Sequence, residues 1–454
     1  MNRKLSRILT VLIVLFCVAL LAGAGILLVQ VLPKKAPGEV TSLETSSVFE
    51  SETAAVAPDR EEAYEGSLPP AAEVQPAPEQ TPDEPSGPDA QDPSEQAPSD
   101  ALISDASDKL ARQTLASMTE DEKLWQLFYV TPELLTGVET ATRAGDSTKE
   151  ALEAMPVGGI VYFAKNFEDR AQTQDMLHNT KSYTKIPLFL GTDEEGGTVS
   201  RVGSNPAMGG IEIPSMQSLG EQADPAAVYQ AGQNIAENLR AVGLNMDFAP
   251  VADVASSSSA VIGSRSFGSD AQLCASMVSV LTGSLQTKGV VPCLKHFPGY
   301  GSAITDDHYG TSILTKTLDD LEACDFLPFV SGIEAGAPFV MVSHLSVPEV
   351  VGDETPSDLS SKIVSEILRN KLGFTGVIIT DSHQMASITD HYTSGEAAVK
   401  ALQAGVDMIL MPQDLQAAFD GVKAALNDGT LTQERIDESV LRILQVKAEY
   451  NILQ

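Results

Sequence analysis

The sequence predicts a (β/α)8 barrel, in which eight parallel strands alternate with helices and close into a ring. Two observations carry this prediction: short apolar runs bounded by turn residues recur along the chain, and helical patterns lie between them. A third excludes the main alternative, since no phosphate-binding glycine fingerprint of a dinucleotide-binding sheet follows the first run. The apolar runs are residues 127–130, 159–163, 187–192, 245–250, 290–294, 339–342, 376–380 and 408–411.

The first element of the chain is an apolar segment that follows three basic residues. Residues 8–32 would span roughly 37 Å as a helix, which is enough to cross a bilayer. A cleavable signal peptide has a shorter apolar core, although residues 22–24 offer a small-residue cleavage pattern. Residues 1–35 therefore predict a signal anchor that places the remainder on the extracellular face of the cell membrane, or a secreted protein if the segment is cleaved.

Residues 36–106 form the second element, a linker rich in Pro, Glu, Asp, Ser and Ala in which Arg60 is the only basic residue. Such a composition buries too little apolar surface to offset the entropy of ordering, so we expect a disordered tether. The whole chain has a net charge of −33 and no Lys/Arg cluster. Both facts argue against a nucleic-acid partner.

Residues 107–454 make up the predicted barrel domain. A helix near the start of this domain is predicted by a capping box, in which the Thr119 side chain accepts from first-turn amides and the Glu122 side chain accepts from the amide of Thr119. Helical patterns then separate the apolar runs, so strand and helix alternate as a parallel sheet requires. The clearest of these patterns cover residues 225–242, 272–287, 360–372 and 395–404.

Polar side chains follow six successive runs, at the carboxyl ends of the predicted strands. Because the active site of this architecture is built at that end of the barrel, we expect these side chains to meet there. They are Asp193 to Glu195, Asp253, Lys295 with His296, His344, Asp381 to His383, and Asp414.

The densest group is the loop after the fifth run, which reads Lys-His-Phe-Pro-Gly-Tyr-Gly from Lys295 and ends in Asp306, Asp307 and His308. A solvated polar loop is the plain alternative for any one of these residues. Two histidines, a lysine and two acids within fourteen positions favour a functional loop instead.

These motifs resemble glycoside hydrolase family 3, and specifically its single-domain bacterial β-N-acetylglucosaminidases (β-N-acetylhexosaminidases). The resemblance covers nearly all of residues 107–454. Its pieces are Val-Gly-Gly-Ile at 157–160, Asp-Glu-Glu-Gly-Gly at 193–197, Asn-Met-Asp-Phe-Ala-Pro-Val at 245–251, Arg-Ser-Phe-Gly at 265–268, the loop at 295–308 and Ile-Thr-Asp at 379–381.

The resemblance implies an exo-acting retaining glycosidase with Asp381 as the nucleophile and His308, oriented by Asp306, as the acid/base. Such a reaction needs a carboxylate on one face of the anomeric carbon and a proton donor on the other. A histidine suits the donor role because its pKa lies near neutrality. The resemblance further implies a carbohydrate substrate, no metal, no cofactor and a monomer. The implied sugar contacts are Asp193, Arg201, Arg265, Lys295 and His296.

The chain also departs from the sequences that it resembles. Relatives usually carry histidine at Tyr300, Asp-Thr at residues 302–303, glutamine at Glu194 and arginine at Thr198, and they differ at His383 as well. None of these changes removes a proposed catalytic group, so they bear on acceptor preference and rate. The sequence offers no physical account of His383.

Three other functions remain as alternatives. A metal-dependent hydrolase could use the histidines at strand ends, but no His-x-His or His-Glu-x-x-His spacing supports it. A membrane-tethered glycan-binding protein without activity would have no need of the nucleophile. A β-glucosidase of the same broad family would lack the Asp-x-His loop. The exported position makes cell-wall glycan, such as peptidoglycan fragments, the expected substrate, with hydrolysis and phosphorolysis both open.

Overall fold

The structure is a computed structural model that describes residues 103–255, 259, 261–303, 310 and 312–454. In this part of the chain, eight parallel strands form a closed barrel in the order β1 to β8, with β8 paired to β1. All eight predicted runs are therefore confirmed as strands. Their bounds are β1 Phe128–Val130, β2 Gly159–Val161, β3 Phe189–Thr192, β4 Met246–Asp247, β5 Val291–Phe297, β6 Phe339–Val342, β7 Val377–Ser382 and β8 Met408–Leu410.

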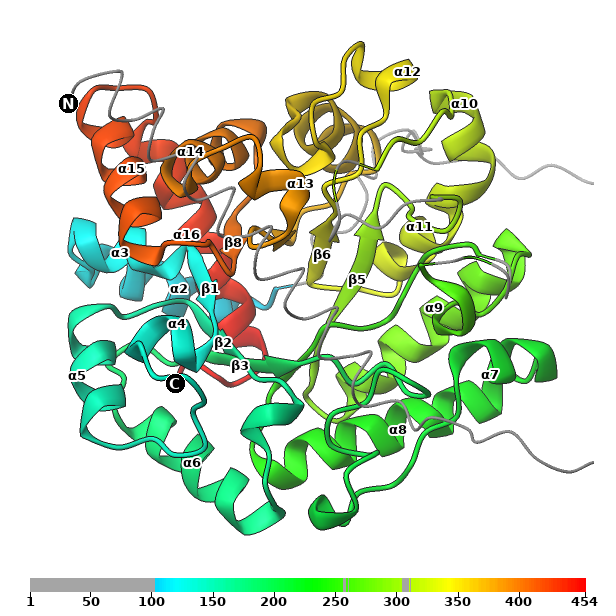
Figure 1. Cartoon of the computed structure of the whole chain (residues 1–454), viewed down its shortest axis with the longest axis horizontal. Coiled ribbons are helices and arrows are strands. Elements are labelled where there is room, and N and C mark those ends of the chain that lie inside the picture. The colour runs from blue at the N-terminus through cyan, green and yellow to red at the C-terminus, as the bar shows by residue number, and fades with distance from the viewer. Residues whose placement is uncertain (1–102, 256–258, 260, 304–309, 311) are drawn as a thin grey trace, which may run out of the picture. The chain divides into compact units, whose positions relative to one another are not determined.

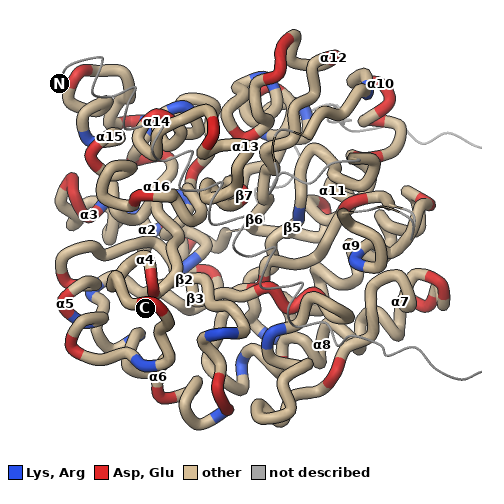
Figure 2. Tube along the Cα trace, viewed as in Figure 1, with Lys and Arg blue, Asp and Glu red and all other residues tan. Residues whose placement is uncertain are grey.

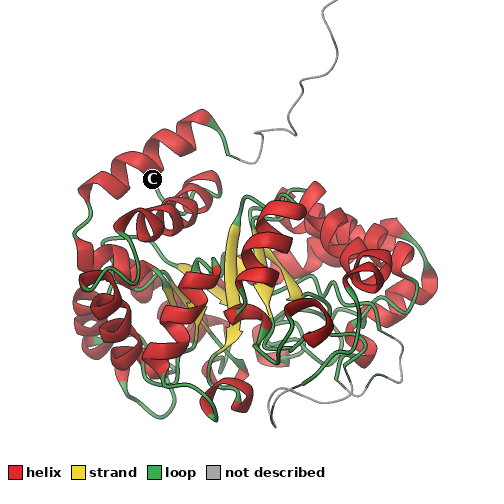
Figure 3. Ribbon diagram, turned by 90° about the horizontal axis from the view of Figure 1, so that it is seen from above, coloured by secondary structure: helices red, strands yellow, loops and turns green. Residues whose placement is uncertain are grey.

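Helices surround the strands on the outside, as Figures 1 and 3 show. The predicted capping box is present, with Thr119 as the N-cap and Glu122 bonded back to its amide. The α-helices are α2 Asp105–Ser117, α3 Glu120–Gln126, α4 Pro132–Thr136, α5 Asp146–Ala154, α6 Arg170–Ser182, α7 Met216–Gln222, α8 Pro225–Val242, α9 Ala271–Thr287, α10 Leu318–Asp320, α11 Phe326–Glu334, α12 Pro348–Val351, α13 Ala386–Thr389, α14 Ser394–Ala404, α15 Leu415–Asn427 and α16 Gln433–Glu449. Shorter turns include η3 Gly263–Arg265 and η6 Ser357–Leu359, and η7 Lys362–Lys371 is a π-helix.

Strands β5 and β7 run further than the apolar runs that predicted them. The amide of Lys295 donates to Pro250 and its carbonyl accepts from Ala252, so pairing continues through residues that a polarity argument assigns to a loop. On β7, Asp381 likewise lies within the strand. The consequence for function is that Lys295, His296 and Asp381 sit on the rigid barrel wall.

The barrel interior is filled by side chains below the mouth. Tyr129 is fully buried, and its ring lies edge-on to Phe248 with 5.2 Å between centroids. Gly191 makes room for this tyrosine, because a Cβ there would stand 2.5 Å from the Tyr129 hydroxyl oxygen. A filled interior is typical of this architecture and confines any ligand to the mouth.

The predicted membrane anchor and nearly all of the predicted linker fall on residues 1–102, which lie outside the described residues. Helix α2 begins at Asp105, two residues before the predicted start of the barrel domain. Within the part that the structure describes, no helix is both long and apolar enough to cross a membrane. Figure 2 shows acidic positions scattered over the outer helices with basic positions between them.

A buried lysine lies at the amino end of the barrel. Lys447 of α16 is fully buried; its Nζ donates to Gln126 Oε1 at 2.6 Å and lies 5.1 Å from the centre of the Phe189 ring. Burial lowers the pKa of Lys447 to about 7. The folded protein therefore carries a desolvation penalty at this residue around neutral pH.

We expect Lys447→Met to raise the free energy of unfolding by about 1–3 kcal/mol at pH 7, since the desolvation penalty exceeds the cost of leaving Gln126 Oε1 without its donor. The unfolded lysine titrates near 10.5 and the folded one near 7. Between these values the unfolded chain binds more protons, so wild-type stability rises with pH and the advantage of methionine shrinks. Urea unfolding at pH 7, 8 and 9 measures this trend. Exposed Lys288→Met is the control, and a pH-independent difference would contradict the prediction.

Candidate active site

A cavity of about 540 Å³ opens at the carboxyl ends of the strands, a size typical of ligand sites. It brings together six of the residues that the sequence predicted for the site, which come from β5, β7 and the loops after β3 and β4. They are Asp193, Arg201, Arg265, Lys295, His296 and Asp381. The predicted acid/base His308 and its partner Asp306 lie outside the described residues.

Lys295 is the centre of the charged wall of this cavity. Its side chain is 3% exposed, and Nζ lies 2.7 Å from both Asp193 Oδ1 and Glu195 Oε1. Arg265 binds the same glutamate with two parallel contacts, Nε to Oε2 at 2.7 Å and an amino nitrogen to Oε1 at 2.8 Å. Arg201 approaches Asp193 at 4.0 Å. The wall therefore alternates cations and carboxylates.

This alternation fixes the charge of each group. Burial alone would raise the pKa of Glu195, but Lys295 and Arg265 outweigh it and lower this pKa to about 2. Burial opposes the charge of Lys295 too, yet Asp193 and Glu195 raise its pKa above the ordinary value. Charged donors held in place in a water-poor cavity make strong hydrogen bonds to hydroxyl and carbonyl oxygens.

His296 presents its Nε2 to the cavity because its other nitrogen is occupied. Nδ1 lies 2.7 Å from Asp253 Oδ2, and Nε2 lies 3.5 Å from an amino nitrogen of Arg265. The carboxylate of Asp253 also accepts from the amide of Tyr300 at 2.6 Å. Asp253 thus fixes both the orientation of the His296 ring and the position of the backbone at Tyr300, where the following loop begins.

Asp381 stands at the end of β7, across from this charged wall. Its Oδ1 accepts from the amide of Ser382 at 2.7 Å, and the carboxylate is partly exposed to the cavity. The pairing of β7 with β8 shifts register between Ile379 and Ser382. Apolar side chains from β6, β8 and the segments after β7 and β8 complete this part of the cavity, namely Met341, Met385, Leu410 and Met411.

The comparison with known families agrees with this geometry. The model of the glycosyl hydrolase family 3 N terminal domain matches residues 119–446, which is most of the chain. The chain belongs to glycosyl hydrolase family 3. A beta-hexosaminidase of Nitrosomonas eutropha is 35% identical over 268 residues, which cover 58% of this chain and 75% of the relative.

Other members of family 3 extend beyond this chain. A Cellulomonas fimi protein named beta-N-acetylglucosaminidase/beta-glucosidase is 30% identical over 351 residues, covering 75% of this chain and 59% of that protein. The structure of a family 3 beta-N-acetylglucosaminidase from Paenibacillus sp. str. FPU-7 superposes with a TM-score of 0.70 at 32% identity, covering 74% of this chain and 63% of that one. This chain spans less than two thirds of the length of both proteins.

One departure from the family 3 pattern has a clear structural role. Glu194 is fully buried and its carboxylate accepts four hydrogen bonds, from the Ser200 hydroxyl and from the amides of Arg201, Val202 and Gly203, all between 2.5 and 2.8 Å. It therefore shapes the loop that carries Arg201 into the cavity. Two other departures differ in position: Thr198 is exposed, whereas Tyr300 lines the cavity and bonds Ser312 at 3.0 Å.

Sequence analysis placed Glu195 and Asp253 at strand ends but assigned neither of them a role in the site. Their position was the available signal, and no spacing rule indicates which side chain each would face. A further carboxyl, Asp247 of β4, accepts from the amide of Glu194 at 2.9 Å, and burial raises its pKa well above the ordinary value.

Proposed function

We propose that this chain is an exo-acting retaining β-N-acetylglucosaminidase that releases terminal N-acetylglucosamine by hydrolysis. The observation that carries the proposal is the single cavity in which the Asp381 carboxylate faces the cation-rich wall around Lys295. Family membership and the names of the relatives support the same reaction class. The assignment of individual roles rests on the chemistry of retaining glycosidases.

In the proposed reaction, the Asp381 carboxylate attacks the anomeric carbon while His308 gives a proton to the departing glycosidic oxygen. The bond from that carbon to the leaving oxygen breaks, and a covalent glycosyl-enzyme forms. His308 then takes a proton from water, whose oxygen displaces Asp381 from the same carbon. Asp306 orients the imidazole and stabilises its cation. The products are the free sugar and the alcohol of the leaving group.

The charged wall would hold the sugar ring. Arg201, Arg265 and Lys295 donate to hydroxyl oxygens and to the N-acetyl carbonyl, and Asp193 accepts from hydroxyls. Lys295 is anchored by two carboxylates and Arg265 by one, so these donors are already in place before substrate binds. Such preorganisation lowers the cost of orienting the ring.

The cellular setting of the proposal rests on residues 1–106. We place the barrel on the extracellular face of the cell membrane, as a monomer anchored through residues 1–35 and held away by the linker at residues 36–106. Cell-wall glycan, including peptidoglycan fragments, is then the substrate within reach. Protease treatment of intact cells tests this placement, because an extracellular barrel is released whereas a cytoplasmic one is protected.

A β-glucosidase is the second candidate, because the Cellulomonas fimi relative carries both names. The deciding experiment compares 4-nitrophenyl N-acetyl-β-glucosaminide with 4-nitrophenyl β-glucoside on the full-length protein. We expect the acetamido substrate to have the higher kcat/KM, because the cationic wall can bind the N-acetyl carbonyl. A preference for the glucoside would favour the second candidate, and no release from either would favour a binding protein. Product analysis with and without phosphate separates hydrolysis from phosphorolysis.

A further inference from the structure

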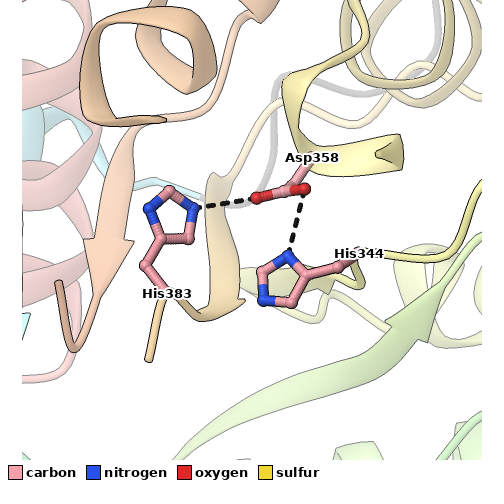
Figure 4. A group of neighbouring side chains, drawn as sticks. All are labelled: His344, Asp358 and His383. Carbon is pink, nitrogen blue, oxygen red and sulfur yellow. Dashed lines mark hydrogen bonds and ion pairs between the residues drawn. The ribbon is translucent and has the colours of Figure 1, made fainter. Parts of the chain in front are cut away.

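A buried trio of side chains lies directly behind the end of β7. His344 follows β6, Asp358 lies in η6, and His383 follows β7; their residues are 0%, 0% and 2% exposed. Asp358 stands between the two rings: His383 Nε2 lies 2.9 Å from its Oδ2, and His344 Nδ1 lies 3.1 Å from its Oδ1 (Figure 4). Neither Asp358 nor His383 was explained by the proposed reaction.

The trio is tied to the main chain beside Asp381. His344 Nε2 lies 2.9 Å from the carbonyl oxygen of Ser382. The amide of the same Ser382 donates to Asp381 Oδ1. Ser382 is therefore held at its carbonyl by the trio while its amide holds the carboxylate. Strand pairing also holds this segment, since the amide of His383 donates to the carbonyl of Leu410, but the register of β7 with β8 shifts between Ile379 and Ser382.

The acceptors around the trio fix where its protons are. A carbonyl oxygen only accepts, so His344 donates from Nε2 to Ser382, and its Nδ1 lies 3.1 Å from Asp358 Oδ1. His383 donates from Nε2, and its Nδ1 has no hydrogen-bond partner among the described residues, which fits a neutral ring. Burial alone would raise the pKa of Asp358, but His344 and then His383 lower it to about 2. Burial lowers the pKa of His383.

We propose that His344, Asp358 and His383 are positioning residues that hold Ser382, and through it the carboxylate of Asp381, in the orientation for attack on the anomeric carbon. This inference rests on the proposed role of Asp381 as nucleophile. It gives His383, which departs from the family pattern, a function: its bond fixes Asp358, which in turn fixes His344. We expect this trio to affect kcat more than KM, because the charged side chains that we propose to bind the sugar come from other strands and loops.

A metal ion is the other chemistry that two histidines and an aspartate can serve, since their ligand atoms lie within 4.8 Å of one another. The geometry favours hydrogen bonding. Figure 4 shows each ring facing a different carboxylate oxygen; His383 Nε2 makes a hydrogen bond of 2.9 Å to Oδ2, and His344 Nδ1 lies 3.1 Å from Oδ1 as an ion-pair contact. Coordination by His383 Nε2 would also leave a proton on its buried Nδ1, with no acceptor among the described residues.

The test is His383→Leu in the full-length protein, assayed with an aryl N-acetyl-β-glucosaminide. We expect kcat to fall about 10- to 100-fold, because a slightly misplaced nucleophile is costly, while KM stays within about twofold. His383→Gln should recover most of the loss, since its amide nitrogen can stand where Nε2 stood and donate to Asp358. Ser387→Ala is the matched control: this buried hydroxyl lies in the same segment and has no partner among the described residues, so kcat should not change.

Three results would overturn the inference: kcat of a folded His383→Leu within twofold of wild type, equal losses for leucine and glutamine, or one tightly bound metal ion per wild-type chain that both variants lack. If the leucine variant does not fold, Asp358→Asn tests the same link, because asparagine directs an N–H at one of the ring donors, and the same fall in kcat is expected. Inactive wild-type protein would count against the proposed function instead, which keeps the two failures distinct.

Discussion

Asp381→Asn should lower kcat on an aryl N-acetyl-β-glucosaminide by at least ~10³-fold, because an amide cannot form the glycosyl-enzyme. The fold should tolerate the change. The carboxylate is partly exposed, and among the described residues it accepts one hydrogen bond, from the Ser382 amide, which the amide oxygen of asparagine also accepts. Release of 4-nitrophenolate under saturating substrate measures kcat, and thermal unfolding confirms that the variant is folded.

The control for Asp381→Asn is Asp414→Asn. Asp414 also follows a strand, but it is exposed and caps α15 through the amide of Ala417, a bond that asparagine keeps. Its activity should equal that of wild type. More than a tenth of wild-type turnover in a folded Asp381→Asn would remove Asp381 from the nucleophile role.

His308→Ala is the companion variant. Nitrophenolate can leave without receiving a proton, so the first step continues while the second step, which needs the base, slows. The glycosyl-enzyme should therefore accumulate and give a burst of product.

Lys295→Met should destabilise the protein by about 3–5 kcal/mol and raise KM, because removal of one partner leaves buried carboxylates uncompensated. Lys295 is the shared cation of Asp193 and Glu195, and Glu195 is 1% exposed. Arg265 continues to neutralise Glu195, whereas the cation that remains beside Asp193 within the described part of the chain is Arg201, at 4.0 Å. Urea unfolding at pH 7 and initial rates measure the two effects.

The double variant Lys295→Met with Glu195→Gln separates stability from function. Removal of one carboxylate should restore part of the lost stability, while KM stays raised because the donor to the sugar is still absent. Acid adds a second readout. The folded pKa of Glu195 is about 2 and the unfolded value about 4.5, so its ion pairs stabilise the wild type fully above pH 4.5 and are lost as the pH falls toward 2. Equal acid stability of wild type and Lys295→Met would contradict this account.

The fold was predictable because its signal is periodic. Eight apolar runs and the helical patterns between them are properties of short windows, and the bounds of α8, Pro225–Val242, agree with the predicted residues. Strand ends were not predictable from polarity. Lys295 and Asp381 continue β5 and β7 because neighbouring strands offer backbone partners to them, and those partners are distant in sequence. The π-helical winding of η7 is likewise invisible in a helical pattern.

The site was predictable as a set of strand-end residues, and its internal pairing was not. Position after a strand brought Asp193, Lys295, His296 and Asp381 to one cavity. That Glu195 binds two cations, or that Glu194 organises a loop, depends on side-chain directions that only closure of the barrel sets. The role of Asp358 was not predictable from the sequence, because it lies in a connection between strands and its contacts are with two histidines that only the fold brings to it.

The charged side chains of the cavity and its methionines come from different strands and loops. The charged side chains, apart from Asp381, come from β5 and the loops after β3 and β4, whereas three methionines line the cavity from β6 and from the segments after β7 and β8. Methionine is unbranched and adapts its shape to its neighbour at little cost. We therefore expect exchange of the methionines to change which aglycone is accepted, while the charged side chains that we propose to bind the sugar ring stay unchanged.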